Sequence, residues 1–457
     1  MIIYHKKFCF SVLLLILFLW VPLSRGEPNV HQVNVDGKEV IVKGEFFGSK
    51  ESPYPILWAF GSDIRENGKV AQKEVGVVAN DSVLVGDSGL AVWSRGQGVT
   101  YDNLSRLPEV SHTYRAENDG WLGWPLAFGG DDTPFSDKAY VSWRVKAPGD
   151  ISKYVLVAVS DLGGEFNLGA DQFTPGENVE IVPVGAQQRT GRIVHFDSER
   201  RQVHLEVSGL SSKHFSGAKV LGLDSGATAV LDSERYYRSS SSSKFFRSHE
   251  TISGAGTRFV VSTNRLITVQ FDSRGKEIQR AFEFEGDSGY GLPAITENPD
   301  WNLVEVFIDL SGKYGEGIIT VNGNESKTFS GLDISETKPK DAGPTVANIG
   351  WEAAGGVEEI NVALNFGEIY FDKTPQRAVL TNSKVLKDAR SNVEVQYSSY
   401  WSDNEVRFES QFGGLNDAIP IYLFIFDENN ESNSAGFCVY MCEKDELPPS
   451  RIMLNVE

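Results

Sequence analysis

The chain has 457 residues and a strongly acidic balance, with 62 Asp and Glu against 43 Lys and Arg and a formal net charge of −19. A surface of this sign repels nucleic acid and anionic lipid, so we expect neither as a partner. Beyond the N-terminal stretch, no apolar run of the sequence reaches the length of about 20 residues that a membrane span needs. We therefore expect no membrane span.

Residues 1–26 have the pattern of a signal peptide. MIIYHKKF carries two lysines, and the apolar run CFSVLLLILFLWVPL follows it directly. This order, with small residues at positions 24 to 26, is typical of a segment that is cleaved on export. We place the cleavage after Gly26 and expect the mature chain to be secreted or held at the cell surface.

The rest of the sequence predicts an almost all-β protein. It contains 45 Gly and 27 Phe, and short alternating runs recur with turn signals between them. Residues 302–323, NLVEVFIDLSGKYGEGIITVNG, are an example: alternation of apolar and polar residues, a Gly-rich turn and a second short run predict a β-hairpin with one buried face. A chain of this length is expected to divide into two or three domains.

The two ends of the chain are predicted to belong together. VNVDGKEVIVKGEFFGSK at 34–50 resembles the first strands of TIG-type immunoglobulin-like domains, and matching later strands occur only within 377–437. Because chain termini often lie close together, a domain inserted between early and late strands is sterically easy. We expect one split sandwich, and the alternative is a free N-terminal hairpin followed by a separate C-terminal sandwich.

Between the ends, several strands resemble concanavalin-like jelly rolls, as found in legume lectins, laminarinase-type glucanases and several polysaccharide lyases. The resemblance is carried by KAYVSWRVKA (138–147), SSKFFRSHETISGAGTRFVVS (242–262), the hairpin at 302–323 and NFGEIYFDKT (365–374). It implies a two-sheet sandwich. A pattern of strands of this kind is not a specific signature.

A smaller β module is predicted inside the jelly roll. FTPGENVEI (173–181) and FSGAKVLGL (215–223) share a Phe, a Gly and a β-branched run, and each precedes a Gly-centred turn and another strand. This spacing indicates two related halves of a compact unit. The expected division is a signal peptide (1–26), the first immunoglobulin-like strands (27–54), the jelly roll in two parts (55–161 and 234–375), the inserted module (162–233), the immunoglobulin-like remainder (376–445) and a flexible tail (446–457).

The sequence lacks the paired carboxylates that laminarinase-type glucanases present from one strand. A retaining glucanase needs two carboxylates about 5.5 Å apart, whereas Glu368 and Asp372 would stand roughly 13 Å apart on a strand. We interpret both as structural or solvated.

A polysaccharide lyase would need a cation to neutralise a uronate and a Tyr or His to take the proton. Arg247 and His249 share one strand face, and Tyr140 and Arg144 share another, opposite the apolar Val141, Trp143 and Val145. If both strands lined a concave sheet, these four residues would gather into a proton-moving cleft. Ordinary polar residues on a wet sheet face are the alternative.

Aromatic residues provide the candidate ligand-binding positions. Trp121 and Trp124 lie in the Gly-rich segment DGWLGWPLAFGG, where they would either stack on a sugar ring or plug the end of a sandwich. His195 and His204 flank a predicted hairpin, and either a metal site or solvent-facing positions would explain them.

Two further features bear on ions and redox state. Cys438 and Cys442 either form a disulfide through a tight turn or stay as two free thiols, since export permits oxidation. Loop carboxylates at 129–137 and 426–432 are the candidate structural calcium ligands, although neither segment has EF-hand spacing. No cofactor is required by any pattern in the sequence.

Three functions remain open from the sequence. The first is a non-catalytic, lectin-like or structural protein that binds extracellular polysaccharide or a cell-surface glycan. The second is a lyase that cleaves an acidic glycan by β-elimination, and the third is a purely architectural component of an envelope or matrix. The absence of a carboxylate pair disfavours hydrolysis, so we expect binding or architecture.

Overall fold

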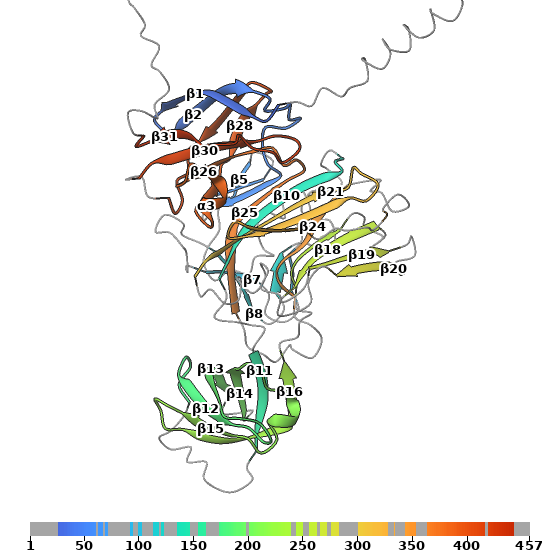
Figure 1. Cartoon of the computed structure of the whole chain (residues 1–457), viewed down its shortest axis with the longest axis vertical. Coiled ribbons are helices and arrows are strands. Elements are labelled where there is room, and N and C mark those ends of the chain that lie inside the picture. The colour runs from blue at the N-terminus through green and yellow to red at the C-terminus, as the bar shows by residue number, and fades with distance from the viewer. Residues whose placement is uncertain are drawn as a thin grey trace, which may run out of the picture.

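The all-β prediction is confirmed by the computed structural model of the chain (Figure 1). The structure describes residues 26–60, 63–66, 69–71, 92–94, 99–102, 113–117, 120–122, 135–146, 154–160, 173–197, 201–238, 244–249, 256–262, 266–271, 276–282, 300–327, 333, 343–352, 363–415 and 419–442. Within these residues, helix is limited to α3 (Leu386–Ala389) and a 3-10 turn at Ser212–His214. None of the described helices is long and apolar enough to cross a membrane. The predicted signal peptide and the tail at 446–457 lie outside the described residues.

The large sandwich has two antiparallel sheets. The first runs in the order β23 (Asn324–Lys327), β22 (Glu316–Val321), β21 (Asn302–Asp309), β10 (Lys138–Lys146), β25 (Ala363–Asp372), β3 (Leu57–Phe60), β4 (Asp63–Glu66) and β5 (Lys69–Ala71), with β7 (Val99–Asp102) paired to β8 (Thr113–Glu117) and β8 to β25. The second runs β20 (Glu277–Phe282), β19 (Leu266–Phe271), β18 (Gly256–Ser262), β17 (Lys244–His249), β24 (Thr345–Glu352), β9 (Gly120–Leu122) and β6 (Val92–Ser94). Trp143 of β10 stacks on Phe246 of β17 with ring centroids 5.4 Å apart, so the interior lies between the two sheets.

The hairpin predicted at 302–323 is present as β21 and β22. Val306 pairs with Ile319, in the register that the alternation requires. Asn322 and Gly323 then turn the chain into β23 with φ angles of 50° and 77°. Positive φ at both central residues is the demand of a tight hairpin turn, which Asn-Gly meets at low cost.

A closed barrel lies below the large sandwich in Figure 1. Its strands follow the order β11 (Tyr154–Ser160), β14 (Gln202–Glu206), β13 (Arg189–Asp197), β12 (Asn178–Val182), β15 (Lys219–Gly222) and β16 (Thr228–Arg238). The two similar segments lie side by side, because β12 pairs with β15. The barrel is longer than the segment 162–233: β11, which we had expected in the jelly roll, pairs with both β14 and β16 and closes the ring.

A second sandwich joins the first described strands to the last ones, and these lie together at the top of Figure 1. One sheet has the order β1 (Asn29–Asp36), β2 (Glu39–Glu45), β29 (Glu405–Glu409) and β28 (Ser398–Trp401); the other has β27 (Val393–Val395), β26 (Arg377–Thr381), β30 (Ile421–Phe426) and β31 (Phe437–Tyr440). Val42 pairs with Val406, and its side chain shares a core with Leu380 and Ile425. β1 and β2 are therefore not a free hairpin. We call this unit the split sandwich.

Candidate functional site

The split sandwich covers the outer face of the first sheet of the large sandwich. Trp58, Tyr140, Phe307 and Tyr370 on that face form one buried cluster with Tyr397 from the split sandwich. The rings of Trp58 and Tyr397 are 5.7 Å apart between centroids. We call the contact between the two sandwiches the junction.

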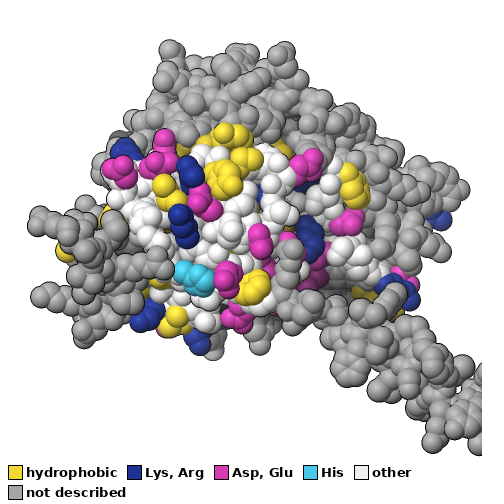
Figure 2. All heavy atoms as spheres, turned by 90° about the horizontal axis from the view of Figure 1, so that it is seen from above, with side chains coloured by type: hydrophobic (Ala, Val, Ile, Leu, Met, Phe, Trp, Pro, Cys, Tyr) yellow, Lys and Arg dark blue, Asp and Glu magenta, His cyan; other side chains and the backbone are white. Residues whose placement is uncertain are grey.

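The far end of the split sandwich has a different character. Seen from that end, acidic and basic side chains are interspersed with apolar ones, some of which adjoin one another (Figure 2). Such mixing is typical of a solvated surface. The junction, by contrast, buries charged and aromatic side chains, such as Arg144 and Tyr140.

Arg144 lies buried at the junction and not on a wet sheet face, where the sequence had placed it. It is 2% exposed, and its Nε donates to Glu368 at 3.2 Å. Its Nη2 donates to the backbone oxygen of Val393 at 2.7 Å and lies 3.4 Å from Glu394. The alternation of β10 was read correctly, but it shows only which residues share a face and not what covers that face.

A bulge in β25 brings Glu368 to this arginine. Ser142 pairs with Tyr370, whereas Arg144 pairs with Gly367, so β25 carries one extra residue between these pairs. Glu368 adopts a φ of 50° there. Bulges re-aim side chains in this way, and the carboxylate consequently meets the guanidinium.

Asp372 has a comparable structural role. It is buried and forms an ion pair with Lys50. Burial raises the pKa of Asp372, although Lys50 opposes this effect. Glu368 and Asp372 thus each face a buried cation, as expected for structural carboxylates.

The four residues considered for elimination do not come together. Trp143 and Phe246 face each other through the interior, so the neighbouring side chains Arg144 and Arg247 point to opposite outer faces of the sandwich. Arg247 is half-buried on β17. His249 ends the same strand, and its side chain lies outside the described part.

The predicted tryptophan platform differs from the structure as well. Trp121 belongs to the short strand β9, not to a loop, and is only 6% exposed. It pairs with Gly350, where a Cβ would lie 3.0 Å from the Cα of Trp121. Glycine therefore permits the close approach of β24 and β9. Trp124 lies outside the described residues.

The cysteines and the calcium loops have structural explanations. Cys438 and Cys442 form a disulfide with Cα atoms 5.8 Å apart. In the loop 426–432, Asp427 accepts hydrogen bonds from the backbone amides of Asn429 and Glu431, at 2.8 and 2.9 Å. The described residues contain no group of three or more His, Cys, Asp or Glu placed to hold a metal, and most of the segment 129–137 lies outside them.

The two barrel histidines are neighbours. His195 and His204 pair across β13 and β14, with ring centroids 5.3 Å apart and nearly perpendicular planes. His204 is 3% exposed and His195 is half-buried. Their edge-to-face packing therefore accounts for the pair. Within the described residues, no third His, Cys, Asp or Glu joins them to form a metal site.

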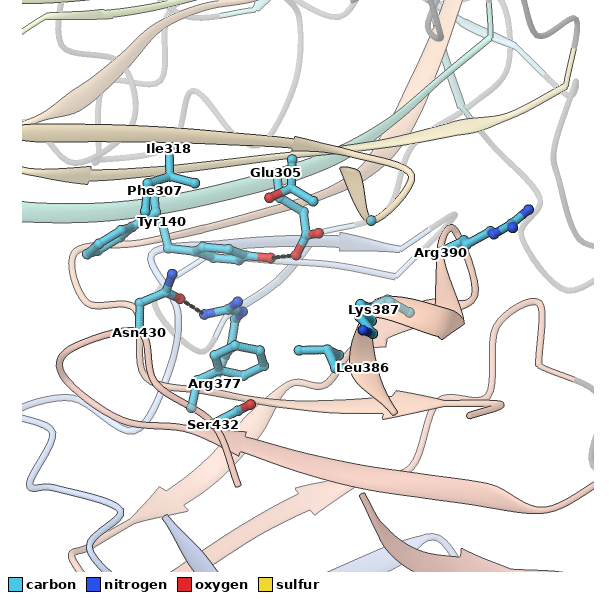
Figure 3. Close-up of a pocket in the computed structure, with 14 residues that line it drawn as sticks. Tyr140, Glu305, Phe307, Ile318, Arg377, Leu386, Lys387, Arg390, Asn430 and Ser432 are labelled. Carbon is cyan, nitrogen blue, oxygen red and sulfur yellow. Dashed lines mark hydrogen bonds between the residues drawn. The ribbon is translucent and has the colours of Figure 1, made fainter. Parts of the chain in front are cut away.

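A cavity of about 240 Å³ opens at the junction (Figure 3). Strands β10, β21 and β22 of the large sandwich form one wall, and β26, α3 and the loop after β30 form the other. The lining residues are Tyr140, Glu305, Phe307, Ile318, Thr320, Gly323, Arg377, Leu386, Lys387, Arg390, Val393, Phe426, Asn430 and Ser432. In Figure 3 the guanidinium of Arg390 points away from the cavity.

Tyr140 and Glu305 are linked on the upper wall of the cavity in Figure 3. The hydroxyl of Tyr140 donates to Oε1 of Glu305 at 2.6 Å. Burial, together with the nearby carboxylate of Glu305, raises the pKa of Tyr140 well above its ordinary range, although Arg377 opposes this effect. Tyr140 therefore stays protonated and is unsuited to accept a proton.

Arg377 lies on the opposite wall. Its guanidinium carbon is 3.7 Å from the ring centroid of Tyr140 and 3.5 Å from that of Phe426. Nη1 donates to the backbone oxygen of Pro375 at 2.8 Å and to Oδ1 of Asn430 at 2.7 Å. This geometry holds a flat cation rigidly at the cavity wall.

Sequence reasoning named Tyr140 and the loop 426–432, which both line this cavity, but gave them other roles and did not bring them together. Arg377 opens the segment RAVLTN, which gave only a strand signal, and Asn430 lies in a polar turn with a φ of 62°. Glu305 was one polar position of an alternating strand. The cavity forms only when segments spread between positions 140 and 432 of the sequence meet, and local patterns carry no signal for that.

The sequence matches no known protein-family profile. It has no significant match among curated proteins. Solved structures of similar shape include the receptor-binding domain of botulinum neurotoxin type G, which is 10% identical with a TM-score of 0.24 over 86% of this chain and 80% of that one. An alginate lyase is 12% identical with a TM-score of 0.27, over 70% of this chain and 97% of that one. At TM-scores this low, the similarity assigns neither a family nor a function to this chain.

Proposed function

We propose that the protein is a secreted or cell-surface, non-catalytic, lectin-like protein that binds carbohydrate, and that the junction cavity holds one sugar unit. The observation that carries the proposal is the mixed lining of this cavity. A carboxylate, a hydroxyl, an amide and cations surround it together with the apolar side chains of Phe307 and Ile318.

This combination suits the chemistry of a sugar. Sugar hydroxyls need both acceptors and donors, while the C–H face of the ring packs on apolar side chains. Glu305 supplies an acceptor, Thr320 a hydroxyl and Asn430 an amide, from two different sandwiches. The volume of about 240 Å³ lies below the roughly 300–1,000 Å³ of sites for drug-sized ligands, and this favours one terminal or branch sugar over a long chain.

The same geometry favours binding over elimination. Tyr140 is held protonated by burial and donates its hydrogen to Glu305. Arg144 is committed to two carboxylates and to the backbone. Tyr140 is therefore unsuited to take the proton and Arg144 is not available to neutralise a uronate, so these two residues do not support the lyase alternative.

We also propose export and a division into three domains. The apolar N-terminal run supports a cleaved signal, and the Cys438–Cys442 disulfide is of the kind that persists outside the cytosol. The large sandwich, the barrel and the split sandwich would each be a domain, since separate apolar clusters fill the barrel and the split sandwich. The junction between the two sandwiches then positions the ligand.

The test is isothermal titration of the mature chain with a panel of neutral and uronate-containing oligosaccharides. We expect saturable heat with at least one sugar and a loss of roughly tenfold in affinity on Glu305→Gln, because a charged acceptor at the cavity wall becomes a neutral one, and hydrogen bonds to charged groups are the stronger kind. Glu316→Gln, on the same hairpin but outside the cavity lining, is the matched control and should bind normally.

Other outcomes point elsewhere. Heat that continues until the sugar is consumed, with appearance of an unsaturated uronate, would indicate lyase turnover and sink the non-catalytic proposal. If no sugar of the panel gave measurable heat of binding, the purely architectural alternative would be favoured. Equal loss of binding in Glu305→Gln and Glu316→Gln would show that the sugar binds outside the junction cavity.

A further inference from the structure

The junction contains buried cations of two kinds. Arg144 meets Glu368 and Glu394, and Lys50 meets Asp372. Removing a charge from water is costly, and such a charge is normally matched by an opposite one nearby. Both of these cations therefore follow the ordinary rule.

Arg377 is a buried cation that forms no ion pair among the described residues. The residue is 4% exposed, yet within the described part of the chain no carboxylate lies within 4.0 Å of its nitrogens. Its Nη1 donates to two neutral oxygens, and its buried Nε donates to none. The faces of its guanidinium rest on two aromatic rings. A full positive charge is thus held at the cavity wall without a carboxylate in direct contact, and the carboxylate of Glu305 lies beyond the Tyr140 ring.

A counter-charge can reach this cation from the cavity. Arg377 lines the cavity, and Lys387 lines it from the exposed side of α3 (Figure 3). Planar guanidinium groups bind carboxylates and sulfates through parallel hydrogen bonds. The chain as a whole is acidic, whereas the cavity lining contains one carboxylate, that of Glu305, beside these two cations.

We propose that the junction cavity selects an acidic sugar, whose carboxylate or sulfate group is bound by Arg377 with Lys387 at the rim. Glu305 on the opposite wall accepts a hydrogen bond from a ring hydroxyl, and it would repel the anionic end. The two walls therefore fix the orientation of the sugar. This inference rests on the proposed function, because it names the class of ligand for the same site.

The experiment compares sugars that differ only in the charged group. Methyl glucuronoside is titrated against methyl glucoside, and galactose 6-sulfate against galactose, with the full mature chain at low salt. We expect the charged member of at least one pair to bind about tenfold or more tightly, because hydrogen bonds to a charged group are strong. The two pairs distinguish a carboxylate ligand from a sulfate ligand.

Variants assign the selectivity to the cavity. Arg377→Gln should reduce the preference for the charged sugar to less than about threefold, whereas Arg377→Lys should keep part of it. Because Arg377 is buried and these variants could fail to fold, Lys387→Ser is the second probe and should lower the affinity for the charged sugar by about two- to threefold. Lys384→Ser, exposed on the same segment but outside the cavity lining, is its matched control and should change nothing.

The outcomes separate this inference from the proposed function. Equal binding of charged and neutral sugars would overturn the acidic selectivity while leaving sugar binding in place. A preference that survives in both Arg377→Gln and Lys387→Ser would also overturn it. If no sugar binds but acetate or inorganic sulfate does, and Arg377→Gln abolishes that binding, the anion site stands and the sugar-binding function fails.

Discussion

The barrel and the junction are stabilised in contrasting ways. The barrel is one continuous segment, 154–238, and its interior is a cluster of buried apolar side chains such as Phe215, Leu205 and Val220. The junction joins residues as far apart as Arg144 and Glu394, and it buries charges. A barrel of this kind depends on packing that is local in sequence, whereas the junction depends on correct pairing of distant charged groups.

The largest expected effect would come from breaking the buried ion pairs of the junction. Arg144→Met leaves Glu368 and Glu394 without their cation, and the loss of one partner of a buried pair costs about 3–5 kcal/mol. We expect the two sandwiches to unfold at lower denaturant while the barrel is unchanged. Tryptophan fluorescence reports this directly, since no Trp lies within 154–238.

The barrel offers a matched control for this change. Arg192 and Glu206 form a similar pair at 2.6 Å, but the two side chains are 35% and 20% exposed. An exposed pair contributes at most about 1 kcal/mol, so Arg192→Met should hardly move either transition. If both arginine variants lost the same stability, burial would not be what distinguishes the junction.

A comparable loss in the free energy of unfolding is expected when a large side chain is removed from the core of the barrel. Phe215 is fully buried at the start of the second similar segment, and Phe215→Ala should cost about 3–5 kcal/mol. The loss should be confined to the barrel, as seen by hydrogen exchange of its amides, with the fluorescence transition of the sandwiches unmoved. A shift of the fluorescence transition by the same amount would show that the barrel and the sandwiches unfold as one unit.

The same contrast explains what could be predicted from the sequence. The hairpin at 302–323 and the similar segments of the barrel are local patterns, and both were found. β11 was assigned to the wrong unit because YVLVAVS has the same alternation whether it closes a barrel or extends a sheet. Strand periodicity carries no information on which sheet a strand joins.

The candidate site lies beyond the reach of local patterns for a related reason. Tyr140 and Arg144 were correctly placed on one face, but the covering of that face by the split sandwich depends on contacts with residues near 377–397. Arg377 is noticeable only because it is buried without a carboxylate. Burial and the absence of a contacting carboxylate are properties of the folded chain, and a lone arginine at a strand start gives no sign of either.

A smaller effect, opposite in sign, is expected at Lys373 beside the junction. Burial lowers the pKa of Lys373 from 10.5 to about 8. The unfolded chain therefore binds more protons between about pH 8 and 10.4, and stability should rise with pH across that window. Lys373→Met should remove this dependence and stabilise the protein by roughly 3 kcal/mol at pH 7, as measured by denaturant unfolding.

Its control is the exposed Lys384 on the other side of β26. Lys384→Met should alter neither the stability at pH 7 nor its pH dependence. If Lys373→Met were neutral or destabilising at pH 7, the ammonium group would be well solvated or well paired in the folded protein, and burial would not be the source of the lowered pKa.

The smallest effect concerns Glu177, a buried carboxylate at the turns of the barrel. Glu177 precedes β12, and its carboxylate accepts hydrogen bonds from the amides of Thr174 and Ser225 and from the hydroxyl of Ser225, at 2.6, 3.0 and 2.9 Å. It thus ties the first of the similar segments to the turn before β16. Burial acts to raise the pKa of Glu177, but these hydrogen bonds outweigh it and lower the pKa.

The sign of the resulting pH dependence follows from the lowered pKa. The stabilisation is present above the unfolded value of about 4.3 and is lost as the pH falls through the lower folded value. Glu177→Gln should cost roughly 1–3 kcal/mol at pH 7 and flatten the acid limb of barrel unfolding, measured by hydrogen exchange or circular dichroism between neutral and acidic pH. Glu180→Gln, on the outer side of the same strand, should leave the acid limb as it is. The barrel would then lose stability in acid and the junction would gain it in alkali, so the two regions should respond separately to pH because their buried charges are held by different means.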